Sequence, residues 1–372
     1  MDFSVSHPEE RGFAFSASEV TGAVGDSATV LPVVVAVAAL TDLGLPLLLL
    51  WFGVFQVVWG LRYGAPVSVE PMKALAALVI AGSLTVPELA VAGTLAGVVL
   101  LGLGSVGALG ALAERIDRAV IRGVQLAVAL VLARTGLELG AGAPKTALAA
   151  ALVGGVVVAL GRPRASALAV LGFGIVFAGA ETGMPQIAVP EFVTVVALVP
   201  NAGVAAFAPT PDALSAAGAQ LAMTMGNAAV ATSLLLDDLF DAEVSPDELA
   251  TSMGAMNLLA VPLGALPMCH GSGGVAGKYA FGARTAGANL VLGALYVGAA
   301  FAAAELVAAF PMAALGVVLV LVAAQLGRTS LDTDSLGLTA GVGMLGLATN
   351  VGLAFLVGIA ASAVLARVRT NA

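Results

Sequence analysis

A glycine-rich segment at residues 267–279 contains the side chains best suited to binding chemistry in this sequence. His270 stands there directly before a Gly-Ser-Gly-Gly run at residues 271–274. Apolar runs at residues 253–266 and 286–310 flank the segment. Non-helical backbone at membrane depth persists only where protein or a water-filled cavity satisfies its amides. A helix that begins within the glycine run would point its free N–H groups and positive dipole end into the segment. The pattern therefore predicts a site for a small oxyanion halfway across a membrane.

A second segment, at residues 66–73, has a related pattern. Residues 67–69 alternate apolar and polar side chains, which favours extended backbone, and Pro71 suits the first turn of a helix. The apolar run that follows is too short to span a membrane alone. Glu70 and Lys73 stand one helical turn apart. They are either a structural ion pair or functional groups, with Lys73 binding the anion and Glu70 carrying a coupled proton.

Three further polar residues lie in apolar segments. Glu19 and Asp26 are two helical turns apart and share one face of the first apolar span. We expect Glu19 to lie near the water boundary and Asp26 to be a candidate for proton or cation coupling. Asn227 occupies the corresponding span of the second half, where it either bonds neighbouring helices or lines the site.

The glycine-rich segment also has structural interpretations. His270 is either a packing residue or a ligand that donates to an oxyanion. Residues 272–274 form either a nest of backbone N–H groups or a contact surface for close helix packing. Cys269 is expected to be a small buried residue. Lys278 and Arg284 are expected to mark the cytoplasmic end of the half-helix.

Composition restricts the class of protein. The chain has 372 residues, of which 60% are hydrophobic and 10% charged, whereas soluble proteins carry about 25% charged residues. We therefore predict an all-α polytopic membrane protein. The single cysteine excludes an internal disulfide and a cysteine metal cage, and no metal, cofactor or catalytic residue is predicted. No basic patch indicates a nucleic-acid partner, and no cleavable signal peptide is expected at the N-terminus.

The apolar segments fall into two sets of seven, which gives about fourteen spans, with twelve as the alternative count. The expected spans lie at residues 19–40, 44–61, 67–82, 87–110, 119–138, 146–160, 165–181, 217–236, 249–266, 271–284, 286–308, 310–327, 335–349 and 351–367. The two interrupted segments are third in their sets, as in transporters built from inverted repeats. The predicted parts are an N-terminal tail (1–16), a first repeat (17–181), a connector (182–216), a second repeat (217–367) and a C-terminal tail (368–372).

The basic residues predict the orientation of the chain in a cell membrane. Most of the arginines fall in loops that share one side, and cytoplasmic loops are enriched in basic residues. This places both termini in the cytoplasm. The arginines expected on the cytoplasmic side are Arg62, Arg115, Arg118, Arg122, Arg162, Arg164, Arg328, Arg367 and Arg369.

The segments quoted above resemble those of the molybdate transporter family, which are relatives of the sulfate permeases. The resemblance rests on residues 267–274, 279–285 and 66–73 and on the Gly25–Asp26 pair. It implies a seven-plus-seven inverted repeat, with a core domain of spans 1–4 and 8–11 and a gate domain of spans 5–7 and 12–14. The core would move against the gate during transport. The family usually has glutamine where this chain has Glu70, and leucine and glycine where it has Ser27 and Ala28.

The leading hypothesis is a secondary active transporter of a tetrahedral oxyanion, molybdate first and sulfate second, coupled to a proton or a sodium ion. The alternatives are an anion channel of the same fold, an intramembrane enzyme, and a carrier of another small molecule such as a nucleobase. No nucleophile–base pair supports an enzyme, and a homodimer is an open possibility. The residues expected to bind the substrate are Ser68, Glu70, Lys73, Asn227, His270, Gly271, Ser272, Gly273 and Gly274; those expected to couple transport are Asp26 and Glu70.

Overall fold

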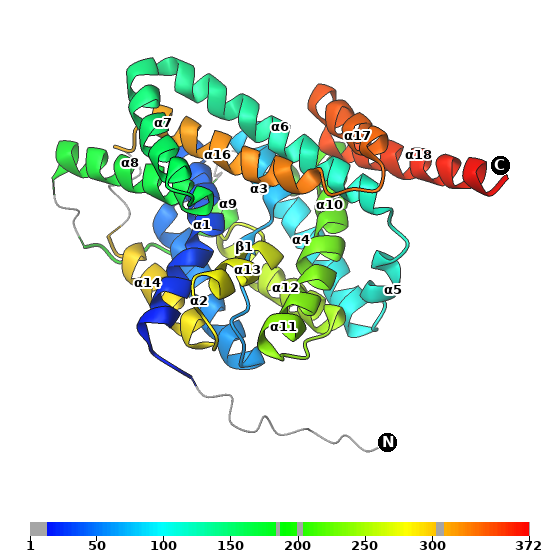
Figure 1. Cartoon of the computed structure of the whole chain (residues 1–372), viewed down its shortest axis with the longest axis horizontal. Coiled ribbons are helices and arrows are strands. Elements are labelled where there is room, and N and C mark those ends of the chain that lie inside the picture. Colours follow the sequence, from blue (N-terminus) through cyan, green and yellow to red (C-terminus); the bar gives the residue numbers. More distant parts are fainter. Residues whose placement is uncertain (1–12, 184–186, 199–203, 303–308, 372) are drawn as a thin grey trace.

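The computed structural model describes residues 13–183, 187–198, 204–302 and 309–371, and these are largely helical. The predicted N-terminal tail and connector lie partly outside the described residues, at 1–12, 184–186 and 199–203. Residues 303–308, at the end of one predicted span, and residue 372 also lie outside them (Figure 1). The helices of the first half are α1 (Ala17–Leu40), α2 (Leu45–Tyr63), α3 (Lys73–Ile80), α4 (Val86–Ser105), α5 (Leu109–Ala113), α6 (Arg118–Gly142), α7 (Pro144–Ala159) and α8 (Ser166–Thr182).

The second half follows a short helix, α9 (Val195–Leu198). Its helices are α10 (Pro211–Met223), α11 (Ala231–Phe240), α12 (Pro246–Ala260), α13 (Ser272–Ala280), α14 (Gly287–Ala300), α16 (Met312–Ser330), α17 (Leu336–Ala348) and α18 (Val351–Asn371). A π-helical segment, Thr224–Val230, joins α10 to α11 without a break. The predicted span at 217–236 is therefore the middle of a longer helical run, and the sequence pattern did not indicate its π-helical part.

Helix starts follow recognisable capping sequences. Thr85 and Glu88 form a capping box at the start of α4, and Ser245 and Glu248 form one at the start of α12. In each box the hydroxyl accepts from the N3 backbone N–H, and the glutamate accepts from the cap residue's own N–H. These contacts fix where two long helices begin.

The two predicted interruptions are confirmed. Strand β1 (Val69–Pro71) precedes α3, and strand β2 (Met268–His270) precedes α13. The two strands pair antiparallel, with Glu70 opposite Cys269. The half-helices α3 and α13 therefore start from one shared two-stranded sheet.

Helices of the two halves pack against each other in pairs. Helix α2 contacts α14, α4 contacts α12, and α6 contacts α16. In Figure 1 helices α6, α7, α8, α16, α17 and α18 lie along one side of the molecule and α2 and α11–α14 on the other, and α1 extends from that second side to α8 and α16. Among the described residues, eight helices are long and apolar enough to cross a membrane, and three shorter apolar helices accompany them.

Replacing Gly293 by valine should force α2 and α14 apart. A Cβ atom at Gly293 would lie 2.7 Å from the Gly53 carbonyl oxygen, and backbone cannot move away easily. We expect the apparent melting temperature in detergent to fall by about 5 °C or more. Gly298 lies on the same helix with open space around it, so Gly298→Val is the matched control. Equal melting temperatures for the two variants would contradict this close contact.

Candidate functional site

Backbone and side-chain amide hydrogen bonds stabilise the antiparallel pair of strands β1 and β2. The Met72 N–H donates to the Pro267 carbonyl oxygen at 2.8 Å. The Asn257 side chain, from α12, bonds both backbone groups of Met268, accepting from its N–H at 2.7 Å and donating to its carbonyl at 2.6 Å. The strands therefore keep their polar groups paired in an apolar surrounding, which membrane depth requires.

The start of α13 is occupied by a carboxylate from the other half of the chain. Glu70 Oε1 accepts the Gly274 N–H at 2.6 Å, and Oε2 forms an ion pair with Lys73. Gly271 leaves room for this carboxylate, because a Cβ atom there would overlap the Glu70 side chain. The predicted backbone anion site thus binds an anion, and in this structure the anion is a side chain.

The Glu70 carboxylate is buried beside residues that are partly exposed. Glu70 is buried, whereas the Lys73 side chain is 26% exposed. Ser272 and Thr29 are partly exposed, and Gly273 is exposed. Ser272, Gly273 and Lys73 therefore keep surface area that the described residues do not cover.

The start of α3 has an acceptor of its own. Gln220, from α10, accepts the Ala74 N–H at 2.9 Å through Oε1 and donates to Thr224 at 2.9 Å. Free N–H groups at a helix start are stabilised by such acceptors. Both half-helices thus have first-turn N–H groups bound by side-chain oxygens.

His270 is fully engaged in structural contacts. Its Nδ1 lies 3.0 Å from the Ser68 carbonyl oxygen, and its Nε2 lies 2.7 Å from the Ser252 hydroxyl on α12. Because a carbonyl only accepts, Nδ1 donates to Ser68, and Nε2 contacts a hydroxyl that also donates to the Leu249 carbonyl at 2.9 Å. Neither ring nitrogen is directed at the exposed start of α13, which favours the structural interpretation of His270.

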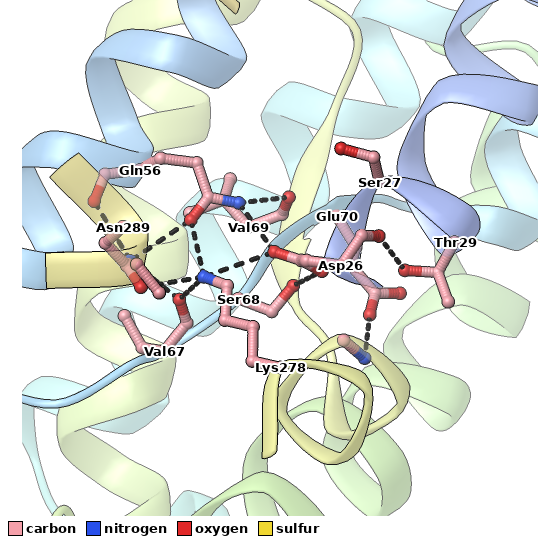
Figure 2. A network of polar contacts seen from close by, with 12 residues as sticks. Asp26, Ser27, Thr29, Gln56, Val67, Ser68, Val69, Glu70, Lys278 and Asn289 are labelled. Carbon is pink, nitrogen blue, oxygen red and sulfur yellow. Dashed lines mark hydrogen bonds and ion pairs between the residues drawn. The ribbon is translucent and has the colours of Figure 1, made fainter. Parts of the chain in front are cut away.

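Asp26 and Ser68 lie in a second, fully buried cluster. The Ser68 hydroxyl donates to Asp26 Oδ1 at 2.6 Å, and the Gln56 amide donates to Asp26 Oδ2 at 3.0 Å. Lys278 completes the cluster, with its Nζ 3.2 Å from Asp26 Oδ2 (Figure 2). Ser68 therefore contacts Asp26 instead of an exposed surface.

Two predicted surface residues are buried, so those predictions are wrong. Lys278 has no exposed area and bonds Gln56, the Val67 carbonyl and Asn289. Glu19 is 2% exposed, and its carboxylate accepts the N–H groups of residues 284, 285 and 288. Both charges have partners hundreds of residues away in sequence. Arg284 is exposed, as expected, and stacks on Tyr279.

Asn227 lies in the π-helical segment and is partly buried. Its amide nitrogen has no hydrogen-bond partner among the described residues. Cys269 is buried, as predicted, and its thiol lies 3.8 Å from the Pro71 carbonyl. The structure thus brings Glu70, Lys73 and residues 271–274 together, and it places Ser68 and His270 behind them.

Sequence reasoning missed four amide side chains that organise these clusters: Gln56, Gln220, Asn257 and Asn289. Each stands alone among apolar residues, where an unpaired amide would be costly. That isolation is a signal that each has a specific partner. Gln56 and Asn289 are fully buried and bond to each other as well as to Lys278.

Known proteins match most of the chain. The model of a family described as "Molybdate transporter of MFS superfamily" matches residues 18–132 and 212–326. Molybdate transporter 2 of Arabidopsis thaliana is 30% identical over 383 residues, covering 86% of this chain and 80% of that protein. These matches bear out the predicted resemblance.

Solved structures of anion transporters have the same fold. The transmembrane domain of the cyanobacterial bicarbonate transporter BicA has a TM-score of 0.64 at 16% identity, covering 93% of this chain and 97% of that one. Murine Slc26a9, an anion transporter in the inward-facing state, has a TM-score of 0.65 at 16% identity, covering 98% of this chain and 70% of that one.

Three observations point to the same class of protein. Eight helices are long enough to cross a membrane, the strands β1 and β2 interrupt two apolar segments and pair with each other, and the family model describes a transporter. The protein is a multi-pass membrane transporter and not an enzyme, as the sequence predicted. The chain belongs to the molybdate transporter family.

Proposed function

We propose that this chain is a secondary active transporter of a tetrahedral oxyanion, namely molybdate, held between the starts of α3 and α13. The observation that carries this proposal is the Glu70 carboxylate, which accepts the Gly274 N–H and pairs with Lys73. Oxygens of an oxyanion would accept hydrogen bonds from the same two donors, the Gly274 N–H and the Lys73 ammonium. We prefer molybdate to sulfate as the substrate because the matched relative is named as a molybdate transporter.

Glu70 and an arriving oxyanion would compete for one place. Two negative charges a few ångströms apart repel strongly at a site away from bulk water. Protonation removes the charge of Glu70 and lets its side chain leave Gly274 and Lys73. A proton would therefore enter with each anion, and Glu70 is the coupling residue that we propose. The other candidate, Asp26, lies behind it with its carboxylate bonded to Ser68, Gln56 and Lys278.

Alternating access would follow from movement of one helix group against the other. We assign α1–α4 and α10–α14 to the core, and α6–α8 and α16–α18 to the gate. The family model matches once in each half, and Asp26 and Gln220 stand equally far into the two matched stretches. This supports an internal repeat, and we propose that the repeat is inverted, has about fourteen spans and leaves both termini in the cytoplasm, as the positions of the arginines predict. A channel would have the same site but no gate that closes behind the ion.

Uptake of radiolabelled molybdate into proteoliposomes tests the proposal. We expect saturable uptake that an inward proton gradient drives above equilibrium and that excess sulfate inhibits only weakly. Uptake abolished by equimolar sulfate would make the protein a sulfate carrier. Flux that never exceeds the equilibrium level under any gradient would indicate a channel, and absence of flux would remove the substrate assignment.

Replacing Glu70 by glutamine should free the anion site and uncouple it from protons. We expect the KM for molybdate at neutral pH to fall about tenfold, as expected when a competitor filling nine sites in ten is removed. Stimulation by a proton gradient should disappear. The exposed Glu114 provides the matched control, Glu114→Gln, with wild-type behaviour. A Glu70→Gln variant that keeps both the wild-type KM and the gradient response would contradict this role.

Replacing His270 by alanine should affect stability more than binding. The change removes the contacts of the ring with Ser68 and Ser252 and leaves their buried groups unpaired. We expect the apparent melting temperature to fall by about 5–10 °C, with little change in the KM of the folded protein. Ser252→Ala, which removes one of the two contacts, should give a smaller fall. A large rise in KM at unchanged stability would identify His270 as a ligand.

A further inference from the structure

The Lys278 ammonium lies in a buried cage of oxygen atoms. Its Nζ donates to Gln56 Oε1 at 3.0 Å, to the Val67 carbonyl at 2.6 Å and to Asn289 Oδ1 at 2.7 Å. Asp26 Oδ2 lies 3.2 Å away and supplies the opposite charge. Figure 2 shows these four oxygens converging on the nitrogen.

The cage is closed to solvent. Lys278, Asp26, Gln56 and Asn289 have no exposed area. The three ammonium protons go to three neutral oxygens, and the carboxylate balances the charge. Removing one member of such a buried pair strongly destabilises a protein, because the other charge is left without a partner.

These four oxygens are also the ligand types that a free metal cation uses. Hard cations bind carboxylate, amide and backbone carbonyl oxygens. In transporters with broken helices, unwound backbone carbonyls coordinate the coupling cation. The Val67 carbonyl belongs to such an unwound stretch, directly before β1. The cage therefore has the chemistry of a monovalent-cation site, and a lysine side chain fills it.

We propose that Lys278 is a tethered cation that occupies a monovalent-cation site, so that this chain needs no sodium ion. The covalently attached charge links α13 to α1, α2 and α14 through Asp26, Gln56 and Asn289. A free ion could leave this place during each cycle, whereas the ammonium remains. The consequence for transport rests on the function proposed above, and it leaves a proton on Glu70 as the coupling ion.

The test removes the Lys278 ammonium by mutation and adds free cations that could bind in its place. Lys278→Ala is purified in detergent, and its thermal unfolding is followed in choline, sodium, potassium or ammonium chloride at equal ionic strength. We expect low stability in choline and a rise of about 3–5 °C in at least one of the three small cations. Ammonium is the closest mimic of the deleted group, and choline is too large to enter.

Three controls make the result specific. The exposed Lys145 gives the matched variant Lys145→Ala, which should melt like the wild type in all four salts. The wild type should show no preference among the cations. The double variant Lys278→Ala with Asp26→Asn should also lose the preference, because the carboxylate that attracts the cation is gone.

A Lys278→Ala variant that melts at the same temperature in all four salts, or yields no monodisperse protein in any of them, would overturn the proposal. Molybdate uptake by the wild type that requires sodium would overturn it as well. The unfolding measurement contains no molybdate, so its outcome is independent of whether the protein carries that anion. In proteoliposomes, uptake by Lys278→Ala should depend on the same cation that stabilises it.

Discussion

The structure depends on one constraint: the extended backbone of β1 and β2 must have all its polar groups bonded away from water. The strands satisfy part of this need by pairing with each other. Asn257 bonds both backbone groups of Met268, and Gln56 donates to the Val69 carbonyl. The Val67 carbonyl, just before β1, accepts from Lys278 and Asn289. Buried polar side chains in this protein are thus arranged around unwound backbone.

The same constraint separates two kinds of charge. Lys278 and Asp26 have no exposed area and are surrounded by fixed partners, so they form part of the framework. Glu70 is buried as well, but its partner Lys73 has a side chain that is partly exposed. A charge with fixed partners stabilises one arrangement, whereas a charge at an open edge can exchange its partner for a solute. The geometry thus separates Lys278 and Asp26, which have fixed partners, from Glu70 and Lys73, for which we propose the transport role.

Much of the fold could be predicted from local sequence. Long apolar runs gave the helices, and the glycine and proline patterns around His270 and Pro71 gave both interruptions. The Glu70–Lys73 pair also follows from local spacing. The burial of Lys278 and Glu19 could not be predicted this way, because most of their partners lie more than 200 residues away. The role of His270 was open for the same reason, since Ser68 and Ser252 become its neighbours only after folding.

The pairing of β1 with β2 has a consequence for biosynthesis. The Ser68 carbonyl and the His270 ring, which are hydrogen-bonded beside this strand pair, are 202 residues apart in sequence. A ribosome adds about 5–20 residues per second, so the first interrupted segment exists for about 10 s or longer before its partner is made. During that time its backbone cannot face lipid. The segment therefore needs temporary shelter, provided by water, by the insertion machinery or by helices of the first half, and the first half reaches its final arrangement only when the second half arrives.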